Sequence, residues 1–226
     1  QYAIEHPVTL PRQKSAMLPI VNQKVEGTKV SIYNQATHAK FPLLGLKFKN
    51  TSGMNLMQGP ITVFEGSVYA GDARILDLQP NEVRLLSYAI DLGTEVEAVN
   101  PNPVDRITKV KVERGIIQAT HLIQQTKVYN AKNRSEHDRL LVVEHPYRPE
   151  LNLVSETKPA ERARDVYRFE VRVPAGKSAR LEVVEEEDLV QQVQLSNKDD
   201  QTIQLFVKSS VSSPAERTGS PHQNPS

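Results

Sequence analysis

The stretch VYRFEVRV at residues 166–173 decides the fold class. Its odd positions, from Tyr167 to Val173, are apolar, whereas most of its even positions are charged. This period of two is typical of a half-buried β-strand, because successive side chains point to opposite faces. The sequence PAGK at 174–177 favours a turn, since proline presets φ and glycine tolerates a positive φ. Alternation resumes at Ala179, so residues 165–185 are predicted to form a β-hairpin.

Similar pairs of short alternating segments recur along the chain. Apolar alternation flanks a Glu-Gly turn within residues 61–70 and an Arg-Gly turn within 110–121, and a Gln-Pro-Asn-Glu turn at 79–82 separates two further segments. Short strands with turns at this spacing are typical of a sandwich or barrel. We therefore predict an all-β chain of two antiparallel β-sandwich-like units. The alternative is one continuous sheet system in which both halves share a core.

The predicted boundary between the units lies near residues 100–105, where Pro101 and Pro103 interrupt both helix and central strand. The first β unit would then span residues 1–103, and a second, immunoglobulin-like sandwich would span 104–210. Residues 211–226 are rich in Ser, Pro and polar side chains, and we predict a disordered tail. The side chains expected in the core are Phe64, Tyr69, Leu86, Val112, Leu141, Tyr167, Phe169, Val171, Leu181 and Leu205.

Composition excludes several classes of function. The 28 basic and 27 acidic residues give a net charge of +1, so we expect no nucleic-acid partner, since such proteins concentrate Lys and Arg on one face. The run Leu140–Val143 is far too short to span a bilayer, so we expect no membrane insertion by this segment. The absence of cysteine excludes disulfides, thiolate metal ligands and cysteine catalysis.

No motif in the sequence supports catalysis. Residues 135–138 read Ser-Glu-His-Asp, but catalytic triads are assembled in space rather than from neighbours, and no G-x-S-x-G motif is present. Glycine-rich phosphate-binding patterns are also missing. We therefore predict no catalytic residue, no cofactor and no metal ligand, and a protein that is not an enzyme.

Two alternatives remain open. A hydrolase acting on envelope polysaccharide would hide carboxylates in a cleft, and Glu144, His145 and Asp165 are the first residues to inspect. Seven Tyr, five Phe and no Trp offer few rings for stacking on sugars. A metal-dependent binding module would use His121 with His145, or the acidic run 185–188, which we otherwise expect to be a solvated strand end.

Two Asn-x-Ser sequences, at 50–52 and 133–135, match the acceptor for N-glycosylation. Both lie at predicted turns, where Asn and Ser are common for structural reasons.

Residues 50–91 carry a resemblance to a known family. LMQGPITVF at 56–64 and VYAGDA at 68–73 are followed by Pro80-Asn81-Glu82 and Ile90-Asp91. This pattern resembles the domain of unknown function in the C-terminal part of mucoidy-inhibitor-A-type bacterial proteins. Two glycines of that pattern are replaced here by Asn81 and Ala89. The resemblance extends weakly over residues 5–185, through Pro7–Leu10 and Thr126–Asn130 with Asn133.

The resemblance implies a bacterial, envelope-associated protein and brings no catalytic residues with it. We expect a non-enzymatic structural or interaction module of a larger cell-envelope protein, located in the periplasm or at the cell surface. Because the chain starts at Gln1 rather than Met, we expect that an export signal has been removed. The expected partners are proteins or other domains of the same polypeptide, and the candidate contact is the strand edge at Gly59–Phe64, where Pro60 favours an edge position. The alternative is that Pro60 only protects this edge from aggregation.

Overall fold

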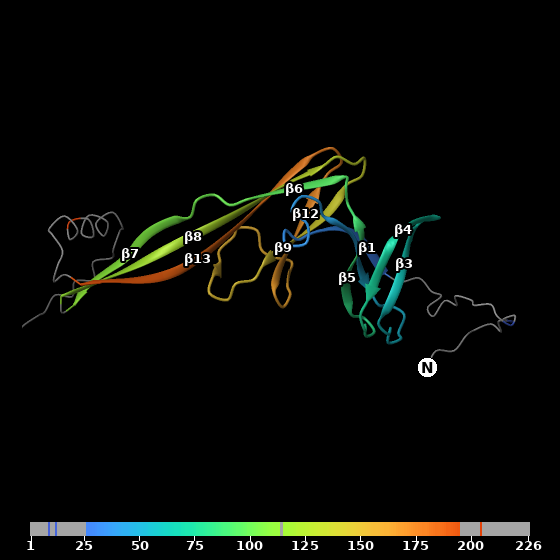
Figure 1. Cartoon of the computed structure of the whole chain (residues 1–226), viewed down its shortest axis with the longest axis horizontal. Helices are drawn as coiled ribbons and strands as arrows, with labels where there is room; N and C mark the ends of the chain where they lie inside the picture. The colour runs from blue at the N-terminus through green and yellow to red at the C-terminus, as the bar shows by residue number, and fades with distance from the viewer. Residues whose placement is uncertain (1–8, 10–11, 13–25, 114, 195–203, 205–226) are drawn as a thin grey trace, which may run out of the picture. The chain divides into compact units, whose positions relative to one another are not determined.

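The computed structural model describes residues 9, 12, 26–113, 115–194 and 204 (Figure 1). Strands dominate these residues, which confirms the all-β prediction. In chain order the strands are β1 (Glu26–Tyr33), β2 (Leu43–Lys49), β3 (Gly59–Glu65), β4 (Val68–Ile75), β5 (Val83–Ile90), β6 (Thr94–Val99), β7 (Val104–Glu113), β8 (Ile116–Asn133), β9 (Arg139–Pro146), β10 (Asn152–Leu153), β11 (Glu161–Arg162), β12 (Val166–Val173) and β13 (Ser178–Gln194). The predicted strand near 203–208, with Leu205, and the tail at 211–226 lie outside the described residues.

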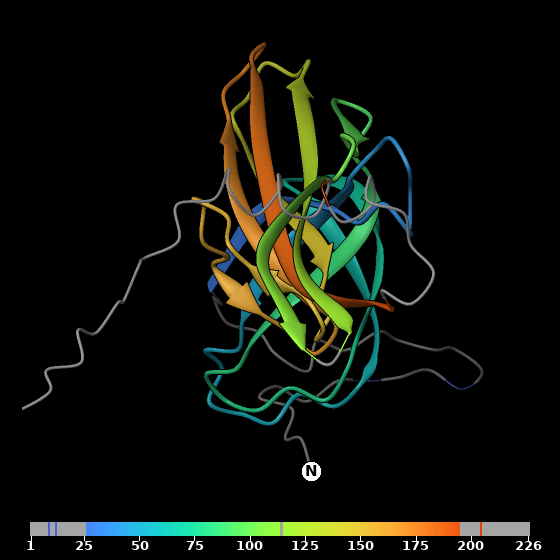
Figure 2. The same ribbon diagram turned by 90° about the vertical axis from the view of Figure 1, so that its left-hand side faces the viewer.

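The described strands form three sheets. One has the order β11-β12-β9-β1-β2-β5, and a second has the order β10-β13-β8-β6 with β7 also paired to β8. The third consists of β3 and β4. Most pairings are antiparallel, as predicted, but β1 pairs in parallel with β9. Figures 1 and 2 show β7, β8 and β13 running side by side as long ribbons.

The chain divides into two compact units. Unit 1 comprises Gln1–Val96, Ala131–Glu144 and Glu170–Ser178, and unit 2 comprises the remaining segments, Glu97–Asn130, His145–Phe169 and Ala179–Ser226. The first division, at Val96, lies a few residues before the proline-rich segment expected as the boundary. The chain then returns to unit 1 twice, and the divisions fall inside strands β6, β8, β9, β12 and β13.

Of the four predicted pairs of alternating segments, two are confirmed as hairpins. Strands β3 and β4 pair across the Gly66 turn, and β7 pairs with β8 from Val104 to Glu113. Immediately before the turn at 79–82, the described residues form no strand but an isolated bridge of Leu78 to Leu56. The prediction for residues 165–185 is wrong in its pairing. Both strands and the turn at 174–177 are present, but β12 and β13 belong to different sheets. Alternation shows that each strand buries one face, and it does not show which strand is the neighbour.

The predicted core is confirmed only in part. Leu86, Leu141, Phe169 and Leu181 are buried, and Tyr167 and Val171 are half-buried. Phe64, Tyr69 and Val112 were expected inside but are exposed. These three side chains lie on the β3–β4 hairpin and on β7, the strand attached to one edge of its sheet. An apolar face is buried only where a second layer covers it, and alternation alone does not reveal that layer.

Unit 1 contains two copies of one loop arrangement, which we call asparagine clasps. The Asn50 clasp joins residues 50–54, after β2, to the turn at 78–82, and the Asn133 clasp joins residues 133–137, at the end of β8, to the turn at 173–177. Both asparagines are buried. In each clasp the serine two positions later donates from its backbone and its hydroxyl to the asparagine Oδ1.

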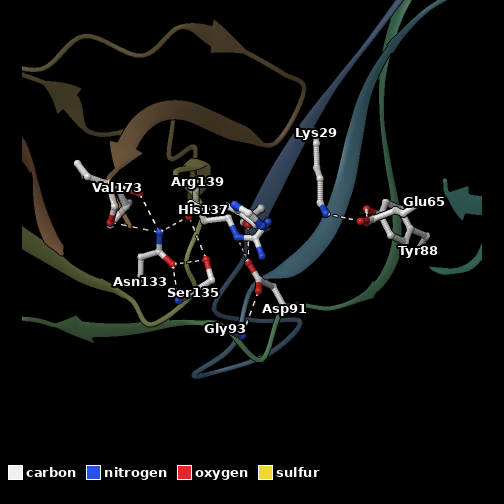
Figure 3. Close-up of polar contacts among 12 residues, drawn as sticks. Lys29, Glu65, Tyr88, Asp91, Gly93, Asn133, Ser135, His137, Arg139 and Val173 are labelled. Atoms are coloured by element: carbon white, nitrogen blue, oxygen red, sulfur yellow. Dashed lines mark hydrogen bonds and ion pairs between the residues drawn. The ribbon is translucent and has the colours of Figure 1, made fainter. Parts of the chain in front are cut away.

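The hydrogen bonds of the asparagine Nδ2 groups also correspond. Asn50 donates to the carbonyls of Met54 (2.8 Å) and Leu78 (3.2 Å). Asn133 donates to the carbonyls of His137 (2.8 Å) and Val173 (3.0 Å), contacts that Figure 3 shows. It also donates to the Pro174 carbonyl.

The two turns that receive the asparagines match as well. Asn81 and Gly176 occupy equivalent positions, and both have φ of 65°. The residue after each of them accepts a hydrogen bond from the asparagine backbone amide, at 3.0 Å and 2.9 Å. The flanking strands correspond too, since β2 is adjacent to β5 and β8 is adjacent to β13. The fold therefore contains an internal structural repeat.

Candidate functional site

The β3–β4 hairpin presents exposed aromatic surface. Phe64 and Tyr69 are cross-strand partners, and they remain 60% and 58% exposed. Their rings meet edge to face with centroids 6.2 Å apart. Asp72 accepts hydrogen bonds from the Tyr69 hydroxyl (2.7 Å) and from Thr62 Oγ1 (2.9 Å). We call these four residues the hairpin face. Aromatic side chains with a polar tip, held in place before binding, are typical of protein-interaction surfaces.

The opposite side of the hairpin packs against the rest of unit 1. Ile61 packs against the buried cluster of Ile75, Leu78 and Leu86. Strand β4 approaches β5 so closely that a Cβ on Gly71 would lie 2.2 Å from the carbonyl oxygen of Tyr88. Gly71 also has φ of 150°, which side chains disfavour. The hairpin is therefore anchored through backbone contact as well as through apolar packing.

Glu65, next to Phe64, connects the hairpin to two other strands. Its carboxylate accepts hydrogen bonds from Lys29 Nζ of β1 (2.7 Å) and from the Tyr88 hydroxyl of β5 (2.9 Å), as Figure 3 shows. The hydrogen bond from Lys29, with that from Tyr88, lowers the pKa of Glu65. Burial, together with the bond to Glu65, raises the pKa of Tyr88 to about 12. At neutral pH the carboxylate is charged and the phenol is protonated.

Strand β3 has an open edge within the described part of the chain, where its single partner is β4. Pro60 lies opposite Arg74 and has no N–H, so we assign its nitrogen to the open edge rather than to the ladder with β4. Residues two apart on a strand direct their amides the same way. The Thr62 amide therefore also faces the open edge. This agrees with the expectation that Gly59–Phe64 is an edge segment.

Asp91 anchors a buried polar cluster in unit 1 (Figure 3). Its carboxylate accepts hydrogen bonds from Ser31 Oγ (2.6 Å) and from the Gly93 backbone amide (3.1 Å), and Arg139 Nε lies 3.7 Å from Oδ2. Ser31 and Asp91 are almost fully buried. The cluster therefore connects β1, β9 and the loop after β5. The Ser31 hydroxyl is too deeply buried to act as a nucleophile on a bound substrate.

A second buried cluster lies in unit 2, around Glu185. One carboxylate oxygen, Oε2, accepts hydrogen bonds from His145 Nε2 (3.1 Å) and from Arg148. Tyr129 contributes its hydroxyl, 2.8 Å from His145 Nδ1. Because an ionised carboxylate can only accept, His145 donates to Glu185 from Nε2. Burial opposes ionisation of Glu185, but the bonds from His145 and Arg148 outweigh it, and the pKa of Glu185 is lowered.

The residues considered for a hydrolase have different partners. Glu144 belongs to unit 1 and accepts a hydrogen bond from Asn34, whereas His145 belongs to unit 2. Asp165 is exposed, and its backbone carbonyl accepts from the Tyr147 amide. Tyr129, the group hydrogen-bonded to His145, is itself only 1% exposed. The Tyr129 end of this hydrogen-bonded chain therefore presents no accessible hydroxyl, whereas His145 and Glu185 line a pocket of unit 2.

The residues considered for a metal site have other partners. His121 contacts Asp105 at 2.9 Å, and His145 contacts Tyr129 and Glu185. Among the described residues, no group of three or more His, Asp or Glu is placed to hold a metal ion. The expectation that the acidic run 185–188 ends a strand is wrong, because β13 continues to Gln194. Glu185 is buried, and Glu186 accepts from Gln124.

The Asn-x-Ser sequences have a structural explanation. Asn50 and Asn133 use their Nδ2 groups, the atoms that glycosylation would modify, to hold the clasps. Ser135 donates to the Asn133 Oδ1 and to the His137 carbonyl, and Asp138 accepts from the Ala175 amide. The Ser-Glu-His-Asp segment is therefore a structural loop. The identical spacing of Asn and Ser was visible in the sequence, but the matching turns were not.

Comparison with known proteins adds no relative. No protein-family model, no curated protein and no solved structure matches the chain. In the part of the chain that the structure describes, no helix is long and apolar enough to cross a membrane.

Proposed function

We propose that this chain is a non-enzymatic interaction module of a larger bacterial cell-envelope protein. The observation that carries the proposal is the open edge of β3 beside the exposed aromatic hairpin face. The buried polar clusters around Asp91 and Glu185 are engaged in internal contacts, whereas the hairpin offers both unpaired backbone and exposed aromatic side chains.

The resemblance to mucoidy-inhibitor-A-type proteins supports the bacterial and envelope parts of the proposal. The residues that carry the resemblance coincide with the hairpin and its supports. Residues 59–64 lie in β3 and residues 68–73 in β4, while Asn81 belongs to the turn of the Asn50 clasp and Asp91 to the buried cluster. A motif whose residues build a presented hairpin is consistent with a binding role.

The partner that fits is an extended segment of another protein. Such a segment would pair its backbone with the open edge of β3 and place apolar side chains against Phe64 and Tyr69. Backbone pairing supplies affinity with little dependence on sequence, and the aromatic pair supplies selectivity for apolar residues. Because Glu65 is held by Lys29 and Tyr88, little ordering of the hairpin is required on binding.

Site-specific photo-crosslinking tests this proposal. A benzophenone-bearing amino acid in place of Phe64, in cells that express the protein, should give a discrete protein adduct on irradiation. The matched control places the same amino acid at Val112, which is 61% exposed but lies on β7. An adduct from position 64 alone supports the proposal. No adduct, or the same adducts from both positions, would refute it.

A further inference from the structure

Unit 2 contains a pocket next to the Glu185 cluster. Its volume is about 370 Å³, within the usual range for sites that bind small molecules. Polar and charged residues of β8, β9 and β13 line the pocket, together with Arg148 and several prolines. The residues on which the argument rests are Lys127, Arg148 and Glu185, with Pro101, Pro103 and Pro146.

The charges around the pocket do not balance. The charge of Glu185 is compensated by Arg148, and its carboxylate accepts a hydrogen bond from His145 Nε2. Lys127 has no such partner. Within the described residues its ammonium forms no hydrogen bond or ion pair, and it lies over the Tyr129 ring at 5.7 Å from the centroid. Among Lys127, Arg148 and Glu185, two cations face one carboxylate, so positive charge remains uncompensated.

The environment of Lys127 supports this reading. Desolvation by burial, followed by repulsion from Arg148, lowers the pKa of Lys127, and Glu185 opposes the shift only in part. Two cations therefore face the same space, and a half-buried lysine lacks an anion. A bound anion would relieve both effects.

We propose that this pocket binds the carboxylate group of a small organic anion between Lys127 and Arg148. The negative charge of a carboxylate would offset the positive charge that Lys127 and Arg148 leave in excess of Glu185. A dianion such as phosphate would add a second charge close to the ionised Glu185. The three prolines add apolar lining that the body of the ligand can contact. Such a site is independent of the hairpin face, so it adds a small-molecule activity to the proposed interaction module.

Titration of the isotope-labelled chain, residues 1–226, with benzoate, followed by amide chemical shifts, tests the proposal. Benzamide, the neutral analogue of nearly the same shape, separates charge from apolar contact, and inorganic phosphate separates a carboxylate from a dianion. All titrations are made at constant ionic strength. Saturable benzoate shifts centred on residues 125–127 and 145–148, with weaker binding of both comparators, support the proposal. No saturable shift there, equal binding of benzamide, or tighter binding of phosphate would overturn it.

Substitutions sharpen the result. Lys127→Gln should weaken benzoate binding about tenfold or more, the loss typical of one charge-assisted hydrogen bond. Lys127→Arg should retain binding, which separates loss of charge from loss of folding. Lys109→Gln makes the same charge change at an exposed position of β7 and should leave the affinity unchanged. Equal affinities of the Lys127→Gln and Lys109→Gln variants would contradict the assigned site.

Discussion

Asn50 and Asn133 occupy equivalent positions in two copies of the same clasp, although they stand far apart in the sequence. Each donates from Nδ2 to the carbonyl four residues ahead and to the carbonyl of a distant turn. Each turn then continues into the strand adjacent to the one that precedes the asparagine. Buried amides with every hydrogen bond satisfied can fix a loop in a single conformation, so the clasps define how the strands of unit 1 are connected.

Asn133→Asp should destabilise the protein by about 2–3 kcal/mol, because a carboxylate oxygen would replace the amide that donates to three carbonyls. Chemical denaturation at pH 7 measures the change. Asn130→Asp is the matched control, since Asn130 is exposed on the same strand, and it should change stability by less than about 0.5 kcal/mol. Equal effects of the two substitutions would show that the clasp contributes little.

Phe169→Ala and Phe64→Ala should differ sharply although the residue change is the same. Phe169 is fully buried, so its truncation should cost about 3–5 kcal/mol. Phe64 is 60% exposed, and its truncation should cost less than about 1 kcal/mol. Thermal and urea unfolding of both variants measures this. A large loss with Phe64→Ala would mean that another layer covers the hairpin face.

Stability should fall in acid through Glu185. Because the pKa of Glu185 is lower in the folded protein than in the unfolded chain, its stabilising contribution is complete above the unfolded value of about 4.3. That contribution is lost as pH falls through the folded pKa. Glu185→Gln should remove part of this acid sensitivity and cost about 3 kcal/mol at pH 7.

Glu182→Gln is the control for Glu185. Glu182 lies on the same strand but is exposed and pairs with the exposed Arg180, so this substitution should cost less than about 1 kcal/mol. Unfolding free energies measured from pH 3 to pH 7 decide the question. An unchanged acid profile in the Glu185→Gln variant would show that Glu185 titrates at its ordinary value.

Tyr88 should ionise later than an ordinary tyrosine. Its pKa is raised to about 12 by burial and by the hydrogen bond to Glu65, so its contribution to stability is complete below about pH 10 and is lost as pH rises through 12. Absorbance of phenolate against pH, compared with the Tyr88→Phe variant, isolates this group among the seven tyrosines. A difference curve with a midpoint near 10 would contradict the described environment.

The sequence predicted the strands better than their neighbours. The alternation in residues 166–173 gave a strand with Phe169 buried, because the period of two reports one buried face. It did not show that β12 and β13 join different sheets, since pairing depends on which distant segment lies alongside. Phe64 was misplaced for a related reason, because no local pattern reveals whether a second layer covers a strand.

The candidate site was also predictable only in part. Pro60 identified the edge strand, because the missing N–H is a property of the residue itself. The hydrogen bonds of Glu65 with Lys29 and Tyr88 were not predictable, because the three residues come from three different strands. The pairing of Glu185 with His145 was hidden likewise, although both residues had been noticed separately. The two Asn-x-Ser sequences were a visible signal of the clasps. Their meaning became clear only from the structure, in which Asn81 and Gly176 occupy equivalent turn positions.

The most direct test of the interaction module is Thr62→Pro, combined with the photo-crosslinker at position 64. Because the Thr62 amide faces the open edge of β3, the substitution removes a donor needed by a partner strand while leaving the ladder to β4 in place. We predict a folded protein, by circular dichroism and thermal melting, that has lost its crosslinked adduct. Ile61→Pro is the matched control, and it should disrupt the hairpin itself. A folded Thr62→Pro variant that retains the adduct at full yield would contradict the account.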